Sequence, residues 1–209
     1  MLLPDKDCRL CPRLAAFRDT NKTKFPDKFN APVPSFGPID SPFLIAGLAP
    51  GLKGANFTGR PFTGDYAGDL LYQTLTKHGF AVGDYKARPD DGLKLQNCRI
   101  ANSVKCVPPE NKPTTEEIKT CARFFHAELQ QMPSLKVILA LGKIAHDSVL
   151  RAYGQKLSSA TFGHGAEHIL PGGVTLIDSY HCSRYNTQTG RLTTEMFEDV
   201  VSLCLKKIK

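Results

Sequence analysis

The sequence predicts an α/β fold of three layers, in which helices cover both faces of a central, mostly parallel, four-stranded sheet. Four apolar segments of strand length alternate with segments of helical pattern along the chain. Strands that alternate with helices usually pair in parallel, because the helix returns the chain to the same end of the sheet. At 209 residues, and without an internal repeat, the chain is expected to form one domain over residues 1–209.

The first third of the chain contains a loop-rich segment, one strand and one helix. Residues 1–40 are rich in proline, lysine and asparagine, so we expect surface loops with a short helix near Pro12–Arg18. Residues 41–46 (SPFLIA) are a buried strand by their apolar pattern. A helix begins at Asp65 or Tyr66, carries three leucines on one side and ends at Gly79.

The rest of the chain alternates strands and helices. Residues 81–96 are polar and expected to be a loop. Thr114 and Glu117 form a capping box after a proline, which predicts a helix that runs to about Gln131. The other expected elements are strands at 98–105, 136–141 and 174–179, a helix that ends near Tyr153, and a terminal helix capped by Thr193 or Thr194.

Charge and composition indicate the class of partner only weakly. The formal net charge of +7 and pI near 9.0 favour polyanionic partners, although the lysines at the C-terminus also suit the dipole of a terminal helix. No apolar stretch is long enough to span a bilayer, and the N-terminus has no secretion-signal pattern, so a cytoplasmic protein is expected. Seven cysteines in such a chain favour a metal site or reactive thiols over disulfides.

The segment from Gly47 to Asp65 (GLAPGLKGANFTGRPFTGD) is the strongest indication of a binding site. It follows a buried strand, and its glycines allow a ligand to approach the backbone closely. Turn residues on both sides of Phe62 hold that aromatic ring in one direction. A pocket for a flat ligand is therefore expected at the end of the strand, where open α/β sheets usually bind ligands.

Four cysteines have the arrangement of a metal-ligand set. Cys8 and Cys11 form a CxxC pair, and Cys106 and Cys121 form a second, wider pair. Tetrahedral thiolate sites hold zinc or an iron–sulfur cluster, and the absence of a second CxxC favours a [4Fe–4S] cluster over a zinc ribbon. The alternative is that all four are buried thiols that act as small apolar residues.

A polar loop follows the last predicted strand. His181 lies at the end of that strand, where it could stabilise charge on a leaving group, although a lone histidine is more often structural. The residues after it offer phosphate contacts and a bulky side chain for a groove: Arg184, Tyr185, Asn186 and Arg191.

Taken together, these motifs resemble the uracil-DNA glycosylase superfamily, and most closely its family 5 branch, over nearly the whole chain. Residues 32–37 (PVPSFG) resemble its proline loop, and the Gly47–Asp65 segment resembles its first active-site motif. Residues 102–106 (NSVKC) resemble its base-reading strand. Residues 181–193 (HCSRYNTQTGRLT) resemble its histidine and DNA-insertion loop, which is usually HPS…NTFTGRLT.

The resemblance implies a monofunctional DNA glycosylase that flips a damaged base out of DNA and hydrolyses its N-glycosidic bond. Phe62 would stack on the base, Asn102 would pair with its edge, and His181 would stabilise the departing anion. The implied base pocket also includes Gly47, Ala49 and Gly51, and the implied DNA contacts are Pro34, Ser183, Arg184, Tyr185 and Arg191. The four cysteines would hold a structural [4Fe–4S] cluster, the partner is DNA, and the protein is expected to be a monomer.

The chain departs from the superfamily pattern at three positions. Ala49 stands where other branches have a polar side chain that positions water, and we expect Asn56 to take that role, with Asp65 as a helix cap. Gly51 stands where the family 1 branch has a tyrosine, which predicts a wider pocket and activity on bases such as hypoxanthine. Cys182 replaces the usual proline after the histidine, so a looser loop is expected.

Two other functions compete with this interpretation. The first is a non-catalytic protein of the same fold that binds damaged DNA, which the apolar Ala49 allows. The second is a zinc-stabilised α/β protein without a DNA role. A colourless preparation with stoichiometric zinc would favour the second function.

Overall fold

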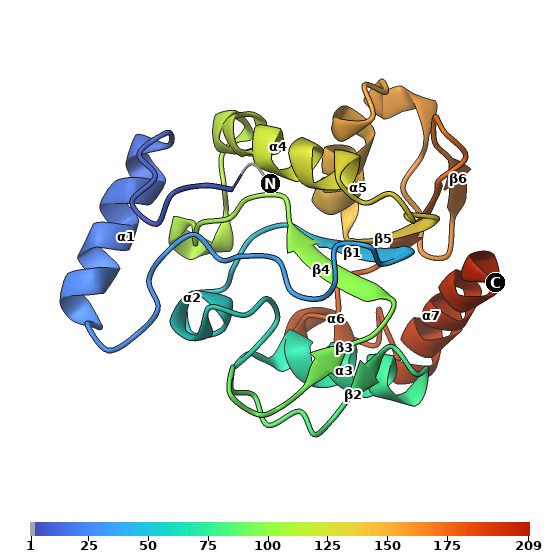
Figure 1. Ribbon diagram of the computed structural model, residues 1–209, viewed down its shortest axis with the longest axis horizontal. Helices are drawn as coiled ribbons and strands as arrows, with labels where there is room; N and C mark the ends of the chain where they lie inside the picture. The colour runs from blue at the N-terminus through green and yellow to red at the C-terminus, as the bar shows by residue number, and fades with distance from the viewer. Residues whose placement is uncertain (1–2) are drawn as a thin grey trace.

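The computed structural model describes residues 3–209 and contains the predicted α/β sheet, with one strand more than expected (Figure 1). The strand order is β4-β1-β5-β7-β6. The parallel strands are β1 (Phe43–Gly47), β4 (Cys98–Asn102), β5 (Val137–Leu141) and β7 (Thr175–Ser179). The expected count of four is corrected to five, because the three-residue strand β6 (Glu167–Ile169) pairs antiparallel with β7 at the edge.

Helices cover both faces of the sheet, as the sequence predicts. Figure 1 shows α4 (Thr115–Gln130) and α5 (Lys143–Ala152) above the sheet, and α3 (Tyr66–Lys77) and α7 (Thr194–Ile208) below it. Every residue of the four parallel strands is buried, and alternate side chains enter the two apolar cores. Ile45, for example, packs in the core with α3 and α7, whereas Leu44 packs in the core with α4 and α5.

Side-chain caps fix the starts of three main helices. The capping box of Thr114 and Glu117 is present at the start of α4, with hydrogen bonds in both directions. Asp65 accepts a hydrogen bond from the backbone N–H of Gly68 and caps α3, and Thr193 caps α7. The N-terminal helix α1 (Pro12–Lys24) continues beyond the predicted Arg18.

Several short elements lie in segments that the sequence pattern leaves as loops. Residues 81–96 contain a two-stranded ribbon of β2 (Ala81–Val82) and β3 (Lys94–Leu95). The remaining short elements are α2 (Ala55–Thr58), η1 (Pro109–Asn111), η2 (Leu157–Ser159) and α6 (Arg184–Gln188). Elements of two to five residues have too few side chains to display a periodic pattern, so sequence analysis does not detect them.

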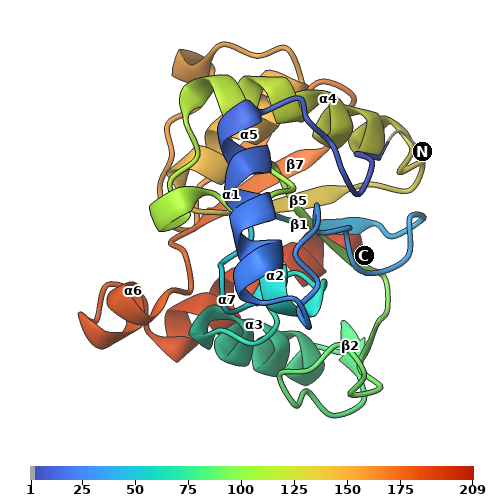
Figure 2. The ribbon, with the colours of Figure 1, turned by 90° about the vertical axis from the view of Figure 1, so that its left-hand side faces the viewer.

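The N-terminal segment packs on the edge of the sheet that carries β4. In Figure 2, α1 lies across the front of the molecule, with α4 near its upper end and α2 near its lower end. Leu14 of α1 is buried against residues of α4, including Phe124. The chain then runs along β4, where Phe36 and Ile100 form an isolated antiparallel bridge that covers the free edge of that strand.

A buried polar network holds this covering segment in place. Glu128 of α4 accepts hydrogen bonds from Ser35 at 2.8 Å, Lys105 at 3.0 Å and Arg99 at 2.7 Å. The Arg99 guanidinium also donates to the carbonyl of Gly37. Buried charges are tolerated when they are paired and hydrogen-bonded, and this network joins α4, β4 and the proline-rich loop.

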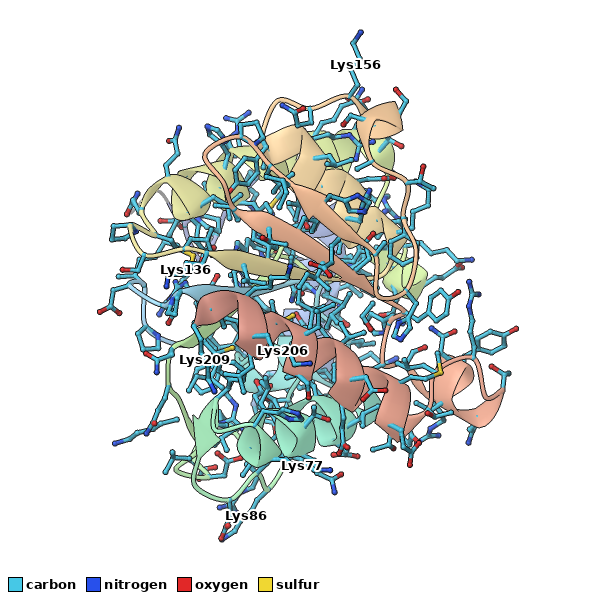
Figure 3. The ribbon with its side chains drawn as sticks, turned by 90° about the vertical axis from the view of Figure 1, so that its right-hand side faces the viewer. Lys77, Lys86, Lys136, Lys156, Lys206 and Lys209 are labelled. Atoms are coloured by element: carbon cyan, nitrogen blue, oxygen red, sulfur yellow. The ribbon has the colours of Figure 1, made fainter. Side chains whose placement is uncertain are left out.

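The lysines at the C-terminus contribute to the net charge without facing the strand ends. Figure 3 shows Lys206 and Lys209 at the end of α7 that lies away from α6. Lys207 forms an ion pair with Glu167 at 2.6 Å, and the last turn of α7 is basic, as the helix dipole favours. In residues 3–209, no helix has the length and apolar character needed to cross a membrane.

Candidate active site

A cavity of about 770 Å³ lies at the carboxyl ends of the parallel strands. Its walls come from the segment after β1, from the residues around Phe62 and Asp65, from Asn102, from the start of α5, and from His181 to Arg184. This position is the usual ligand site of open α/β sheets, and the volume is ample for a nucleobase with part of its nucleotide. The glycine-rich segment and the histidine loop, which are far apart in sequence, therefore share one cavity.

Asn102 and Phe62 line the cavity, and the expected pocket residue Gly47 lies directly behind them without lining it itself. Gly47 pairs with Asn102 across the two parallel strands. A Cβ on Gly47 would lie 2.3 Å from the Asn102 Oδ1 atom and 2.9 Å from the Phe62 ring, so the site requires glycine here. The Asn102 Oδ1 atom is buried without a hydrogen-bond partner in the described chain, although buried polar groups are normally paired. An amide with an unused acceptor beside an aromatic ring is suited to a planar base.

The backbone of Phe62 is strained. Its φ of +51° is rare for a bulky residue, and such strain persists only where the surroundings enforce it. The hydroxyl of Tyr72 donates to the carbonyl of Pro61 at 2.6 Å. Arg60 forms two hydrogen bonds with the buried carboxylate of Asp91, at 2.8 and 2.7 Å. Hydrogen bonds at Arg60 and Pro61, the two residues before Phe62, therefore fix the turn that carries its ring.

His181 lies opposite Phe62, with 6.0 Å between the ring centroids and 31° between the planes. Within residues 3–209 its ring nitrogens make no hydrogen bond, and its backbone carbonyl accepts one from Asn186 at 2.8 Å. Burial lowers the pKa of His181 below its ordinary value, which favours the neutral ring at physiological pH. A neutral imidazole can still donate one hydrogen bond into the cavity.

Asp65 has two different environments at its two carboxylate oxygens. Oδ1 accepts from the backbone N–H of Gly68 at 3.2 Å and caps α3. Oδ2 packs close to Gly51 and Gly54, since a Cβ added to these glycines would lie 3.3 and 2.3 Å from it. Asp65 also lines the cavity. Burial raises the pKa of Asp65 above its ordinary value. The expected helix-capping role is therefore present, and the second oxygen remains available on the cavity side.

Asn56, which is expected to position the water, does not line the cavity. It is 1% exposed and donates from its side-chain amide to the Asn30 Oδ1 atom at 2.8 Å. The cause is the short helix α2, which turns this side chain toward the segment after α1. Of Asn56 and Asp65, Asp65 is the one that lines the cavity.

Ala49 and Gly51 line the cavity, as expected of residues in a base pocket. Four further lining residues have functional side chains that sequence analysis did not select: Lys53, Tyr66, Asn111 and Lys143. Asn111 follows Glu110 in a turn where both residues have positive φ, and Lys143 begins α5 after Gly142. Consecutive positive φ values are visible only in the structure, and Lys143 resembles any other lysine at a helix start.

The residues expected to contact DNA lie around the mouth of the cavity and beyond it. Ser183 and Arg184 line the mouth itself, and Tyr185 projects from α6 with 71% of its surface exposed. Arg184 stacks over Tyr66 at 5.3 Å, and the exposed Arg191 stacks over Tyr180 at 4.6 Å. Pro34, also expected to contact DNA, is exposed on the loop that covers β4 and does not line the cavity.

Cys182 anchors the histidine loop in the apolar core. Its side chain is fully buried, and its thiol lies 3.5 Å from the carbonyl of Ala67. Burial raises the pKa of Cys182 to about 12, so the thiol stays protonated and behaves as a small apolar group. The loop is therefore fixed by packing at the position where the family pattern has proline.

The four cysteines of the expected ligand set meet between α1, α4 and the segment after β4. Cys8, Cys11, Cys106 and Cys121 line one small cavity. Arg18 beside them is 1% exposed, forms no ion pair with a described carboxylate, and donates to the carbonyl of Cys8 at 2.9 Å. Its Nε atom is buried without a partner, and its NH1 group lies 3.7 Å from the Cys106 sulfur.

These contacts test which metal group suits the cysteine set. A buried guanidinium needs negative charge nearby, which thiolates on a metal would provide. In a tetrahedral zinc site, Zn–S bonds of about 2.3 Å hold sulfurs roughly 3.8 Å apart. Among the described residues, the one group of three ligand atoms within 4.8 Å of one another contains no cysteine. The wider spacing suits a larger group such as an iron–sulfur cluster.

Comparison with known proteins shows which family shares these features. Residues 34–203 match the family model described as the uracil DNA glycosylase superfamily. The chain is 46% identical over 199 residues to the type-5 uracil-DNA glycosylase of Thermus thermophilus, covering 93% of this chain and 90% of that protein. It is 39% identical to a type-5 enzyme of Mycobacterium tuberculosis, covering 92% and 75%, and 36% identical to one of Pyrobaculum aerophilum, covering 93% and 86%.

Proposed function

Because the chain belongs to the uracil DNA glycosylase superfamily, we propose that it excises uracil from DNA as a type-5 uracil-DNA glycosylase of base-excision repair. The observation that carries the proposal is the convergence of Phe62, Asn102 and His181 on one cavity at the strand ends. The Phe62 ring lines the cavity, and the Asn102 Oδ1 atom and the His181 ring nitrogens have no hydrogen-bond partner among the described residues. The reaction is the hydrolysis of one N-glycosidic bond.

Base recognition requires a flipped nucleotide, because a base inside the duplex cannot reach the cavity. Phe62 stacks on the base, and its strained backbone keeps the ring in place before the base arrives. The Asn102 amide offers both an acceptor and a donor to the Watson–Crick edge of uracil. Since the Asn102 Oδ1 atom has no partner among the described residues, uracil binding would satisfy it.

Bond cleavage leaves negative charge on the departing uracil and positive character on the sugar. A neutral His181 donates a hydrogen bond to the uracil oxygen where the charge develops, an effect worth on the order of 3–4 kcal/mol in comparable sites. The Asp65 Oδ2 atom accepts a hydrogen bond from the attacking water and orients it toward the sugar carbon. The ionised carboxylate also stabilises the cationic sugar.

Gly51 supports a substrate range wider than uracil. It leaves one side of the cavity without a side chain, next to the Asp65 carboxylate. A tyrosine at this position would fill that space and exclude larger bases. We therefore infer that hypoxanthine is also a substrate, and excision of uracil alone from otherwise identical duplexes would refute this inference.

DNA binding uses the exposed side chains of the histidine loop. Arg184 and Arg191 supply positive charge for phosphates, and Tyr185 is exposed enough to enter the space that a flipped base leaves. Ser183 at the cavity mouth and Pro34 on the covering loop are the remaining expected contacts. Unstacking costs a few kcal/mol, which such contacts offset.

Cys8, Cys11, Cys106 and Cys121 would hold a [4Fe–4S] cluster with a structural role. The unpaired charge of Arg18 and the spacing of the sulfurs support this assignment over zinc. The cluster would tie α1 to α4 and so position the loop that covers β4. Hydrolysis of a glycosidic bond transfers no electrons, so the chemistry requires only the residues of the cavity.

The proposal is tested by excision of uracil from an end-labelled duplex that carries U opposite G. Wild type should release uracil, and His181→Ala should be slower by about 10²–10³-fold, the usual effect of losing one donor to a developing anion. Asp65→Asn keeps a good helix cap but loses the charge, so its rate should fall while its unfolding midpoint stays close to wild type.

Asn56→Ala is the matched control for Asp65→Asn, because Asn56 lies in the same glycine-rich segment but faces away from the cavity. It should lower stability and leave the excision rate of the folded protein unchanged. Loss of excision in Asn56→Ala alone would return the water-positioning role to Asn56. Binding of uracil-containing DNA by wild type without any excision would instead establish a non-catalytic protein that recognises damage.

A further inference from the structure

Three side chains outside the cavity come together between α5 and the strands β6 and β7. His146 of α5, His168 of β6 and Asp178 of β7 each offer one ligand-type atom, and these atoms lie within 4.8 Å of one another. His146 is 1% exposed and the side chain of Asp178 is fully buried, whereas the side chain of His168 is 18% exposed. None of the three lines the large cavity or the cysteine site.

The hydrogen bonds around this group have the pattern of a metal site. Asp178 lies 2.7 Å from the His146 Nδ1 atom and 3.2 Å from the His168 Nε2 atom. The other ring nitrogen of His146, Nε2, lies 3.2 Å from the carbonyl of Ala160, to which it donates. A histidine that binds a metal usually donates its outer N–H to a backbone carbonyl or a carboxylate, and this bond turns Nδ1 inward.

We propose that His146, His168 and Asp178 bind one divalent transition-metal ion of the zinc class. Two imidazoles and one carboxylate are typical zinc ligands, whereas magnesium and calcium prefer sites made mainly of oxygen. The ion would replace the proton that His146 and Asp178 share, with small movements of the three side chains. The partly exposed His168 provides the side from which the ion enters.

The location gives the ion a structural role. The strand β6 has three residues, and among the described strands it pairs only with β7. Figure 3 faces the side of the molecule on which this edge of the sheet lies. A metal held by β6, β7 and α5 would tie this short edge strand to the sheet. The same segment carries His164, which stacks on Tyr180 at a centroid distance of 5.0 Å, next to the histidine loop.

The proposal is tested by titrating ZnCl₂ alone into the full, untagged chain with its native cofactor content, by isothermal calorimetry and by thermal unfolding. Wild type should bind one zinc ion and unfold at a higher temperature when zinc is present. His168→Gln should bind zinc at least about tenfold more weakly, because loss of even a residue that only hydrogen-bonds a ligand typically costs about 10–100-fold in metal affinity, and His168 would bind the ion directly. His126→Gln removes an exposed histidine elsewhere on the molecule and should bind like wild type.

Equal zinc affinity in wild type and His168→Gln would overturn the proposal, since zinc would then bind elsewhere, for example at the cysteines. Absence of both a binding heat and a stability change in wild type would also overturn it, and would leave a hydrogen-bonded network only. Asp178→Asn is a second variant with the same expected loss. If that buried substitution prevents folding, the partly exposed His168→Gln still decides the outcome.

Discussion

Substitution of Gly47 by alanine tests whether close packing of Asn102 and Phe62 creates the base-binding wall. The new Cβ would lie 2.3 Å from the Asn102 Oδ1 atom and 2.9 Å from the Phe62 ring, both far inside ordinary contact distance. To restore 3.4 Å, the amide must move by about 1 Å, and the neighbouring ring limits where it can go. Both groups expected to bind the base are therefore displaced together.

The size of the effect follows from this displacement. A misplacement of about 1 Å in a positioned group typically costs ~10²-fold in rate, which corresponds to about 2.7 kcal/mol of transition-state stabilisation. Overpacking of a buried site costs a further 1–3 kcal/mol or so in stability. We expect kcat/KM for uracil to fall about 100-fold in Gly47→Ala, with a protein that still folds at room temperature.

Alanine substitutions at two other glycines, Gly51 and Gly163, provide controls in which the new Cβ is less crowded. A Cβ on Gly51 would lie 3.3 Å from the Asp65 Oδ2 atom, and one on Gly163 would make only an ordinary 3.6 Å contact with Ala166. Single-turnover excision should therefore decrease in the order Gly163→Ala, Gly51→Ala, Gly47→Ala, with unfolding curves recorded for each. A Gly47→Ala rate within threefold of wild type would refute the reasoning, because Asn102 would then not need its observed position.

Three further predictions concern pH, DNA and stability. Because burial lowers the pKa of His181, the neutral ring should persist below pH 6.5. The value of kcat/KM should therefore stay level from neutral pH down to pH 6.5. A rate that rises as the pH falls toward 6.5 would indicate an imidazolium donor instead. Arg184→Ala should reduce the slope of log K against log salt by about 1, and an unchanged slope in a filter-binding series would show that Arg184 contacts no phosphate. Arg60→Met leaves the buried Asp91 carboxylate unpaired, so urea unfolding at neutral pH should show a loss of about 3–5 kcal/mol. The Arg60 guanidinium holds the pKa of Asp91 far below its ordinary 3.8, so the pair stabilises the fold above that pH, and the difference between variants should shrink as acid protonates the carboxylate.

The fold could be predicted because its central strands and main helices are long and strongly patterned. Four fully buried strands and the capping box at Thr114 are local signals, and the structure confirms them. The fifth strand β6 was not predicted, because Glu167–Ile169 is short, mostly exposed and held by pairing with β7. The paired residues are six to ten positions apart in sequence, from Ile169 with Thr175 to Glu167 with Ile177, and the sequence pattern of so short a segment does not reveal this pairing.

The sequence predicted which residues share the cavity better than it predicted which way each side chain points. Motif order identified the residues that share the cavity, including Phe62, Asn102 and His181, while their chemical roles remain predictions. Asn56 was selected because it is polar and lies within the glycine-rich segment. Its direction depends on the helix α2 and on a hydrogen bond to Asn30, 26 residues away in sequence. Tertiary contacts of this kind decide which side of a loop a polar group faces.

The glycines of the first motif explain why the strand end can lack a polar side chain. Ala49 contributes no functional group, yet Gly51 and Gly54 leave space into which the Asp65 Oδ2 atom fits from the far end of the same segment. The carboxylate reaches the cavity because its other oxygen caps α3, which fixes the side chain in one orientation. One residue thus starts a helix and presents a charge, and neither role excludes the other. A polar residue introduced at Ala49 should therefore not rescue the excision rate of Asp65→Ala unless it also restores the capping bond to the backbone N–H of Gly68.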